Sequence, residues 1–377
     1  MKIVADKAIP FLRGVFEPYA EVLYRDGASF SREDVHDADA LVTRTRTRCN
    51  AALLEGSSVS LIASATIGLD HIDASWCNDH GISFQNAPGC NAGGVVQYVF
   101  SAIFGLADRK GLDLDGLTLG IVGVGNVGRR VASVATRLGF KVLLNDPPRA
   151  RKEGSSGFVS LDEIVRSADI ITCHVPLIRD GEDATYHLFD RQRLSSLRPD
   201  QILINSSRGE VVDNLALKAV LKAGGLRAAS LDVWENEPDI DTELLDLLFT
   251  GTPHIAGYSL DGKANGTWMS VQAVARALDL PCKDWKVNEI PLPAQAVTFR
   301  LNAAGRDTQD VLSEAILYTY QIREDDRRLR ENPATFESQR ADYPVRREFP
   351  AFTVNLSNAT DTQVKALSDI GFKVNNK

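Results

Sequence analysis

The sequence predicts an α/β protein with two Rossmann-like, doubly wound parallel-sheet domains and a small C-terminal α+β domain. Two observations support this prediction. Short apolar runs of strand length alternate with amphipathic stretches of helical period through most of the chain, which is typical of parallel strands covered by helices. The alternation also forms two series, one before about residue 92 and one after about residue 112, with a long helical pattern between them.

The expected elements follow the chain in order. The strands of the first series are KIVAD, ALVTRT, LIASA and ISFQNA, and those of the second are LGIVGVG, KVLLND, IITCHVP, ILINSS and AASLDVW. The helical pattern VVQYVFSAIFGLADR joins the two series. After residue 286 the Pro-containing stretch KVNEIPLPAQ predicts a linker, which is followed by one charged helix over residues 311–332 and a strand–helix–strand pattern over residues 352–374.

The bulk composition argues against several classes of protein. The 42 Lys and Arg residues against 50 Asp and Glu residues give a formal charge of −8, so neither nucleic acid nor an acidic membrane surface is an expected partner. The five cysteines are scattered without a C-x-x-C pair, so neither a disulfide framework nor a metal site is expected. Because no long apolar run and no secretory signal pattern occurs, we expect a cytoplasmic protein.

A glycine-rich motif predicts a dinucleotide-binding turn. Gly123, Gly125 and Gly128 follow the strand LGIV, enclose Asn126 and Val127, and open a helical pattern. In such a motif the glycines permit a tight turn, close approach of a pyrophosphate and close helix–strand packing.

The following strand indicates which dinucleotide binds. It ends in Asp146, which lies 146 − 128 = 18 residues beyond the last glycine, near the position of a carboxylate that binds ribose hydroxyls. This carboxylate would repel a 2′-phosphate, so NAD is the expected cofactor. The nearby Arg149, Arg151 and Lys152 leave NADP as an open alternative.

Three segments that follow expected strands carry candidate catalytic side chains. They are Arg208 in SSRG, Glu237 in DVWENEP and His254 in PHIAGY. Open parallel sheets bind their ligands at the carboxyl ends of strands. These side chains suit the oxidation of an alcohol beside a carboxylate, because Arg binds the carboxylate, His removes the hydroxyl proton and Glu fixes the tautomer of the His.

Seven motifs in order resemble those of the D-2-hydroxyacid dehydrogenases over about residues 1–285. The motifs are ATIGLDHID, NAPGCNA, GIVGVGNVGR, HVPL, INSSRGEVVDN, LDVWENEP and PHIAGY. The resemblance implies that Arg208, Glu237 and His254 form the catalytic trio and that Asp232 contacts the nicotinamide amide. It further implies cofactor contacts at His174, Val175, Pro176, Ser206 and Gly257.

Within the family, the marks NAPGCNA, NDPPRA and HIAGYSLDGKANGT resemble a branch that oxidises 4-phospho-D-erythronate. The product in that branch is (R)-3-hydroxy-2-oxo-4-phosphonooxybutanoate, a precursor in pyridoxal phosphate biosynthesis. The resemblance implies a substrate-binding domain of residues 1–92 with 257–285, an NAD-binding domain of residues 93–256, and a C-terminal domain of residues 286–377 that forms a homodimer. The chain departs from the family at Gln97, at Gly93-Gly94 and at Ser206-Ser207.

The stretch VTRTRTR places Arg44, Arg46 and Arg48 at alternate positions. If this stretch is extended, the three guanidinium groups share a face, as a solvated edge or as an anion receptor. The resemblance implies that Thr45 and Thr66 contact the substrate with Arg44 beside them, and that Tyr258 joins them. Which of the three arginines meets the phosphate stays open.

Two other functions fit the same residues. One is a dehydrogenase for a different acid, such as 3-phosphoglycerate or an unphosphorylated 2-hydroxy acid. The other is a non-enzymatic protein that senses NAD on the same fold, since fold alone does not decide function. Assays on a panel of acids discriminate among the three.

Overall fold

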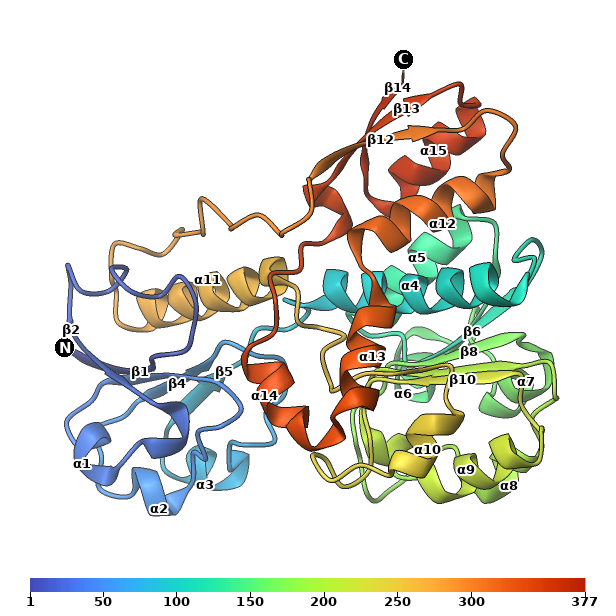
Figure 1. The fold of residues 1–377 in the computed structure, drawn as a ribbon. Helices are drawn as coiled ribbons and strands as arrows, with labels where there is room; N and C mark the ends of the chain where they lie inside the picture. The colour runs from blue at the N-terminus through green and yellow to red at the C-terminus, as the bar shows by residue number, and fades with distance from the viewer. Residues whose placement is uncertain (377) are drawn as a thin grey trace. The chain divides into compact units, whose positions relative to one another are not determined.

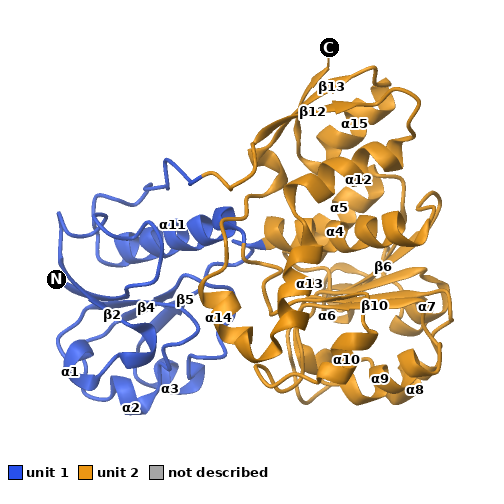
Figure 2. Cartoon of the chain, in the orientation of Figure 1, with its two compact units in different colours: residues 1–91, 259–291 blue, residues 92–258, 292–377 orange. Residues whose placement is uncertain are grey.

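The computed structural model describes residues 1–376, which form two compact units (Figure 1, Figure 2). Unit 1 consists of residues 1–91 and 259–291, and unit 2 consists of residues 92–258 and the chain from residue 292 onward. The two large sheets are parallel throughout. The predicted α/β fold class is therefore confirmed.

Unit 1 contains a five-stranded sheet in the order β2-β1-β3-β4-β5, which is the flavodoxin-like order. Alternate residues of the buried strands point to opposite faces, as strand geometry requires. Val42 and Ala63 pack with Val271 and Val274 of the long helix α11. The elements are β1 Lys2–Asp6, β2 Glu21–Arg25, η1 Gly27–Ser29, α1 Arg32–Val35, β3 Ala40–Thr43, α2 Ala51–Leu54, β4 Leu61–Ser64, α3 Ala74–Asp79, β5 Ser83–Gln85 and α11 Leu260–Ala277.

Unit 2 contains a six-stranded sheet in the order β11-β10-β9-β8-β6-β7. The chain leaves β6 on one side to form β7 and returns on the other side to form β8, so β6 borders the topological switch point at which such sheets bind ligands. The elements up to residue 251 are α4 Ala92–Lys110, β6 Thr118–Val122, α5 Gly128–Arg137, β7 Lys141–Asn145, α6 Pro147–Glu153, α7 Leu161–Ser167, β8 Ile170–Cys173, α8 Arg191–Ser195, β9 Ile202–Asn205, η2 Gly209–Val211, α9 Asn214–Lys222, β10 Ala228–Leu231, α10 Thr242–Leu247 and β11 Thr250–Gly251.

The C-terminal part of unit 2 is a three-stranded parallel sheet with helices on one face (Figure 1). The predicted single helix over residues 311–332 is wrong, because the chain forms two helices with Tyr320 extended between them. The Tyr320 hydroxyl donates to Asp325 Oδ2 at 2.8 Å, which fixes this break. The elements are β12 Thr298–Asn302, α12 Thr308–Thr319, α13 Ile322–Glu331, η3 Pro333–Thr335, α14 Phe336–Ala341, η4 Phe349–Ala351, β13 Thr353–Ser357, α15 Asp361–Ile370 and β14 Lys373–Asn376.

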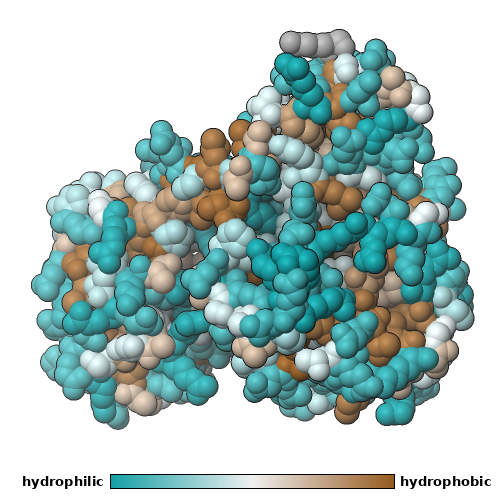
Figure 3. All heavy atoms as spheres, in the orientation of Figure 1, coloured by the Kyte–Doolittle hydropathy of each residue, from teal (hydrophilic) through white to brown (hydrophobic). Residues whose placement is uncertain are grey.

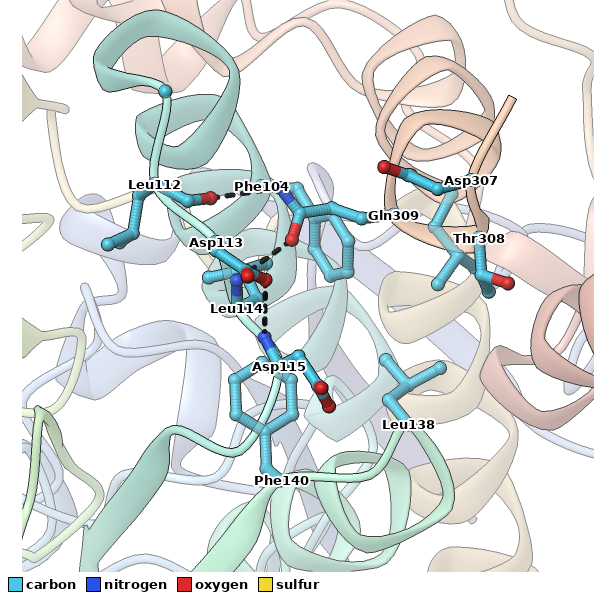
Figure 4. A pocket seen from close by; sticks show the side chains of 12 residues that line it. Phe104, Leu112, Asp113, Leu114, Asp115, Leu138, Phe140, Asp307, Thr308 and Gln309 are labelled. Carbon is cyan, nitrogen blue, oxygen red and sulfur yellow. Dashed lines mark hydrogen bonds between the residues drawn. The ribbon is translucent and has the colours of Figure 1, made fainter. Parts of the chain in front are cut away.

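Helix α4 is buried over most of its length because α12 and α5 pack against it, which explains why its sequence is apolar on all sides. Where α12 begins, it borders a groove of about 590 Å³ (Figure 4). Gln309 donates to the Leu112 carbonyl at 2.9 Å and accepts from the Leu114 amide at 2.8 Å. The Gln309 amide is thus used to join two segments, so we assign this groove a packing role.

The surface in Figure 3 is mostly hydrophilic, with a hydrophobic patch over the segment that follows α11. Leu292 in that segment is 65% exposed. Over residues 1–376 no helix combines the length and the hydropathy that a bilayer crossing requires.

Candidate active site

The glycine motif lies at the switch point of the unit 2 sheet. Gly123 has φ +88, and a Cβ there would lie 2.7 Å from the His174 carbonyl. A Cβ on Gly128 would lie 2.0 Å from the Gly123 oxygen, whereas a Cβ on Gly125 would meet no atom within 4 Å. Two glycines are therefore required by packing, while Gly125 borders open space into which a diphosphate fits.

Asp146 follows β7, caps the start of α6 and faces the glycine turn. Its Oδ2 accepts from the Val124 amide at 2.8 Å, and its Oδ1 accepts from the Arg149 amide at 3.1 Å at the start of α6. A carboxylate has about four acceptor sites, so both oxygens keep capacity for ribose hydroxyls. The residues present therefore fit an adenosine ribose.

The basic residues that left NADP open are largely paired with acids. Arg149 donates to both carboxylate oxygens of Glu153, at 2.9 and 2.6 Å. Arg151 forms ion pairs with Glu182 and Asp183. Neither guanidinium is thus reserved for a 2′-phosphate, which favours NAD.

The segment His174, Val175 and Pro176 follows β8 on the other side of the switch point. Desolvation lowers the pKa of His174 to about 3, and its Nε2 lies 3.0 Å from the Thr172 hydroxyl. The imidazole is therefore neutral at physiological pH. Its position suits a contact with the cofactor and does not suit proton transfer.

Arg208 lies just after β9 in a loop held by Asn205. The Asn205 Oδ1 accepts from the Ser207 amide at 3.1 Å and from its hydroxyl at 2.8 Å, and its Nδ2 donates to the Arg208 carbonyl at 2.9 Å. A Cβ on Gly209 would lie 1.9 Å from the Trp234 oxygen. The close approach of the two loops thus depends on glycine after Arg208.

His254 and Glu237 form the central pair of this site. His254 Nδ1 lies 2.7 Å from Glu237 Oε2, and the other oxygen of Glu237 accepts from the Trp234 amide at 2.9 Å. The two side chains are 33% and 20% exposed, so a ligand can reach the imidazole. Because Nδ1 donates to the carboxylate, Nε2 is left with the lone pair that a general base needs.

Asp232 has a structural function that sequence reasoning missed. Its side chain is buried, with Oδ1 accepting from the Thr252 hydroxyl and the Ile255 amide at 2.7 Å and Oδ2 accepting from the Ala256 amide at 2.8 Å. Burial raises the pKa of Asp232, while the field of His254 and these donors oppose that rise. The carboxylate therefore holds the loop in which His254 has a left-handed φ of +56.

Arg346 holds the same loop from its other side. No motif in the sequence predicted this role. Its Nη2 donates to the Ile255 and Ala256 carbonyls at 3.2 and 2.5 Å, and its guanidinium lies 4.4 Å from the centre of the Tyr320 ring. The residue is 4% exposed. The two residues after His254 thus give their amides to Asp232 and their carbonyls to Arg346.

Gly257 and Tyr258 complete this loop. The Tyr258 amide donates to the Ile255 carbonyl at 2.8 Å, and the Tyr258 ring packs edge-on against Tyr343 at 5.9 Å between ring centres. Arg208, Asp232, Glu237, His254 and Tyr258 all belong to unit 2. Their roles toward ligands stay predictions.

The remaining predicted substrate residues belong to unit 1. The VTRTRTR stretch is not extended throughout, because β3 ends at Thr43 and a turn follows in which the Thr47 amide donates to the Arg44 carbonyl. Arg44 Nε donates to the buried Asp6 carboxylate at 2.8 Å, while Thr45 is exposed. The hydroxyl of Thr66 lies 2.9 Å from that of Ser64. The alternation of arginines therefore does not form one strand face.

Comparison with known proteins identifies the family. The NAD-binding domain of the D-isomer specific 2-hydroxyacid dehydrogenases matches residues 101–256, and a domain of unknown function matches residues 292–371. The crystal structure of the TT0316 protein from Thermus thermophilus is 28% identical, with a TM-score of 0.62 over 74% of this chain and 96% of that one. The chain belongs to the D-2-hydroxyacid dehydrogenase family, and its cofactor is NAD.

Relatives named erythronate-4-phosphate dehydrogenase match almost the full chain. The protein from Bacteroides fragilis is 47% identical over 94% of this chain and 99% of its own length. The protein from Porphyromonas gingivalis is 42% identical over 99% of this chain and 100% of its own length. The resemblance to this branch of the family, inferred from the motifs, is therefore confirmed.

Proposed function

We propose that this protein oxidises 4-phospho-D-erythronate to (R)-3-hydroxy-2-oxo-4-phosphonooxybutanoate with NAD and so serves pyridoxal phosphate biosynthesis. The names of its full-length relatives support this substrate. The observation that carries the chemistry is the 2.7 Å pair of His254 Nδ1 and Glu237 Oε2. A cytoplasmic location, where thiols stay reduced, is supported by five cysteines that form no disulfide among residues 1–376.

In this proposal, the glycine turn and Asp146 would hold NAD, which would supply the acceptor for the hydride from C2 of the acid. His254 Nε2 takes the hydroxyl proton as the C2 carbonyl forms, and Glu237 stabilises the resulting imidazolium. Arg208 binds the substrate carboxylate through paired hydrogen bonds. Asp232 keeps His254 in position. Its carboxylate can accept one more hydrogen bond beyond the three from its loop, and we assign that one to the nicotinamide amide.

The other predicted contacts receive the following roles. Arg44, Thr45, Thr66 and Tyr258 bind the phosphate end of the substrate. Asp146 binds the adenosine ribose, and the amides that follow Gly125 face the diphosphate. Cofactor contacts are also proposed for Gly123, Asn126, Val127, Gly128, His174, Val175, Pro176, Ser206 and Gly257.

A panel of acids tests the proposed substrate. We expect the highest kcat/KM for 4-phosphoerythronate. Erythronate should be at least about tenfold lower because it lacks the phosphate, and each charged hydrogen bond to a phosphate contributes about 1.5–3 kcal/mol. 3-Phosphoglycerate should also be lower, because its chain is one carbon shorter and its phosphate lies nearer to its carboxylate. Initial rates of NADH formation measure this. Equal rates on erythronate would overturn the substrate, and tight NAD binding without oxidation of any acid would favour an NAD-sensing protein.

We also propose that the C-terminal part forms a homodimer. Helices α12 and α15 cover one face of its sheet, whereas Thr353, Asn355 and Ser357 lie half-buried on the other. Purely parallel sheets are usually covered on both faces, so a second copy is the occupant that we propose. Light scattering should give 2 × 41.1 = 82.2 kDa, and the variant N355R should give a smaller mass. A wild-type mass of 41.1 kDa would contradict the dimer.

A further inference from the structure

Arg340 on helix α14 has donors for which residues 1–376 supply no acceptor. Its guanidinium lies 5.8 Å from the centre of the Tyr258 ring and 5.9 Å from that of Phe336. Within residues 1–376, Glu337 alone accepts a hydrogen bond from it, from Nη1 at 2.7 Å. Its Nε is buried and has no acceptor there. Arginine has five N–H donors, and a buried donor without a partner is costly, so this group is suited to a ligand.

The charge around Arg340 is also incompletely balanced. Desolvation opposes its charge, but Tyr258, Glu337 and Glu237 raise the pKa of Arg340, so it stays cationic. The Glu337 side chain is 46% exposed and that of Arg340 is 21% exposed, so water screens this pair from the side of Glu337. Glu237 already accepts from His254 and from the Trp234 amide. Arg340 is therefore a cation in the field of Glu237 whose acidic hydrogen-bond partner within residues 1–376 is the half-exposed Glu337.

We propose that Arg340 is a specificity-determining residue that binds the phosphate of the substrate beside Tyr258. This inference rests on the proposed function and extends it to the segment matched by the domain of unknown function. The carboxylate end is assigned to Arg208. Because Arg44 already shares its charge with the buried Asp6, a phosphate that carries nearly two negative charges needs another cation, and the planar guanidinium matches it well.

The test compares R340A, R340K and the wild type on 4-phosphoerythronate and on erythronate. R340A should raise KM for 4-phosphoerythronate about 10- to 100-fold and leave kcat/KM for erythronate and KM for NAD nearly unchanged. R340K should have a KM for 4-phosphoerythronate between those of the wild type and R340A, because lysine keeps the charge and lacks the planar guanidinium. Inorganic phosphate should inhibit the wild type competitively, and its inhibition constant should rise in R340A.

R327A is the matched control, because Arg327 on α13 is exposed and pairs only with Glu324 and Glu331 within the described chain. It should leave every constant unchanged. A wild type that does not prefer 4-phosphoerythronate refutes the proposed function itself. If the wild type prefers it and R340A loses activity equally on both acids, or keeps the preference, Arg340 only supports Tyr258 and this inference fails. If R340A does not fold, the test uses R340K, for which the ratio of kcat/KM on 4-phosphoerythronate to kcat/KM on erythronate should fall below that of the wild type.

Discussion

The variant H254N lowers kcat by about 10²- to 10⁴-fold and leaves the dissociation constant for NAD nearly unchanged. The physical reason is the position of His254, whose Nδ1 donates to Glu237 and whose Nε2 carries the lone pair that removes the hydroxyl proton. Asparagine suits the position, because it tolerates the φ of +56 found there. Steady-state rates measure kcat, and quenching of tryptophan fluorescence by NAD measures binding.

The chain contains a matched control for this prediction. His187 Nε2 lies 2.7 Å from Glu235 Oε1, and His187 also has a left-handed φ of +47. H187N should therefore remove a similar His–Glu pair without changing kcat. If H254N weakens NAD binding as much as it lowers turnover, or if H187N lowers turnover equally, His254 is not the base.

The fold class followed from local patterns, whereas parts of the site did not. Strand-length apolar runs and the turn around Gly123 each depend on a few adjacent residues, so the sequence predicts parallel sheets and a switch-point site directly. The pairing of His254 with Glu237 was inferred from the motifs that carry them, and the structure places His254 Nδ1 2.7 Å from Glu237 Oε2. Local periodicity misled at VTRTRTR, where the chain turns after Thr43.

Long-range contacts explain what the sequence did not reveal. Arg346 donates to carbonyls 90 and 91 residues earlier in the chain, and neither partner is marked by its residue type, because every residue has a carbonyl. Asp232 was assigned one role by resemblance, yet its oxygens accept from three groups of the His254 loop. Single-sequence patterns report which faces are apolar, and they do not report which distant backbone groups a buried charge satisfies.

Arg346 is the residue whose loss should cost the most stability. The variant R346M keeps an apolar stem but removes the Arg346 donor from the Ala256 carbonyl and leaves the Ile255 carbonyl with the Tyr258 amide alone. It also removes a cation from the surroundings of the buried Asp232. Breaking a buried charged contact in this way costs about 3–5 kcal/mol. Urea denaturation of R346M should therefore show a lower free energy of unfolding by that amount.

Turnover separates a positioning role from simple loss of stability. Asp232 and Arg346 hold opposite sides of the peptide groups that follow His254, so R346M that is still folded should show a lower kcat with little change in KM for NAD. R346K should recover little of either loss, since an ammonium cannot reproduce the planar fork or its stacking on Tyr320 at 4.4 Å. R327A, which removes only exposed ion pairs, should change the free energy of unfolding by about 1 kcal/mol or less. An R346M protein with wild-type stability and turnover would show that the loop is held by Asp232 alone.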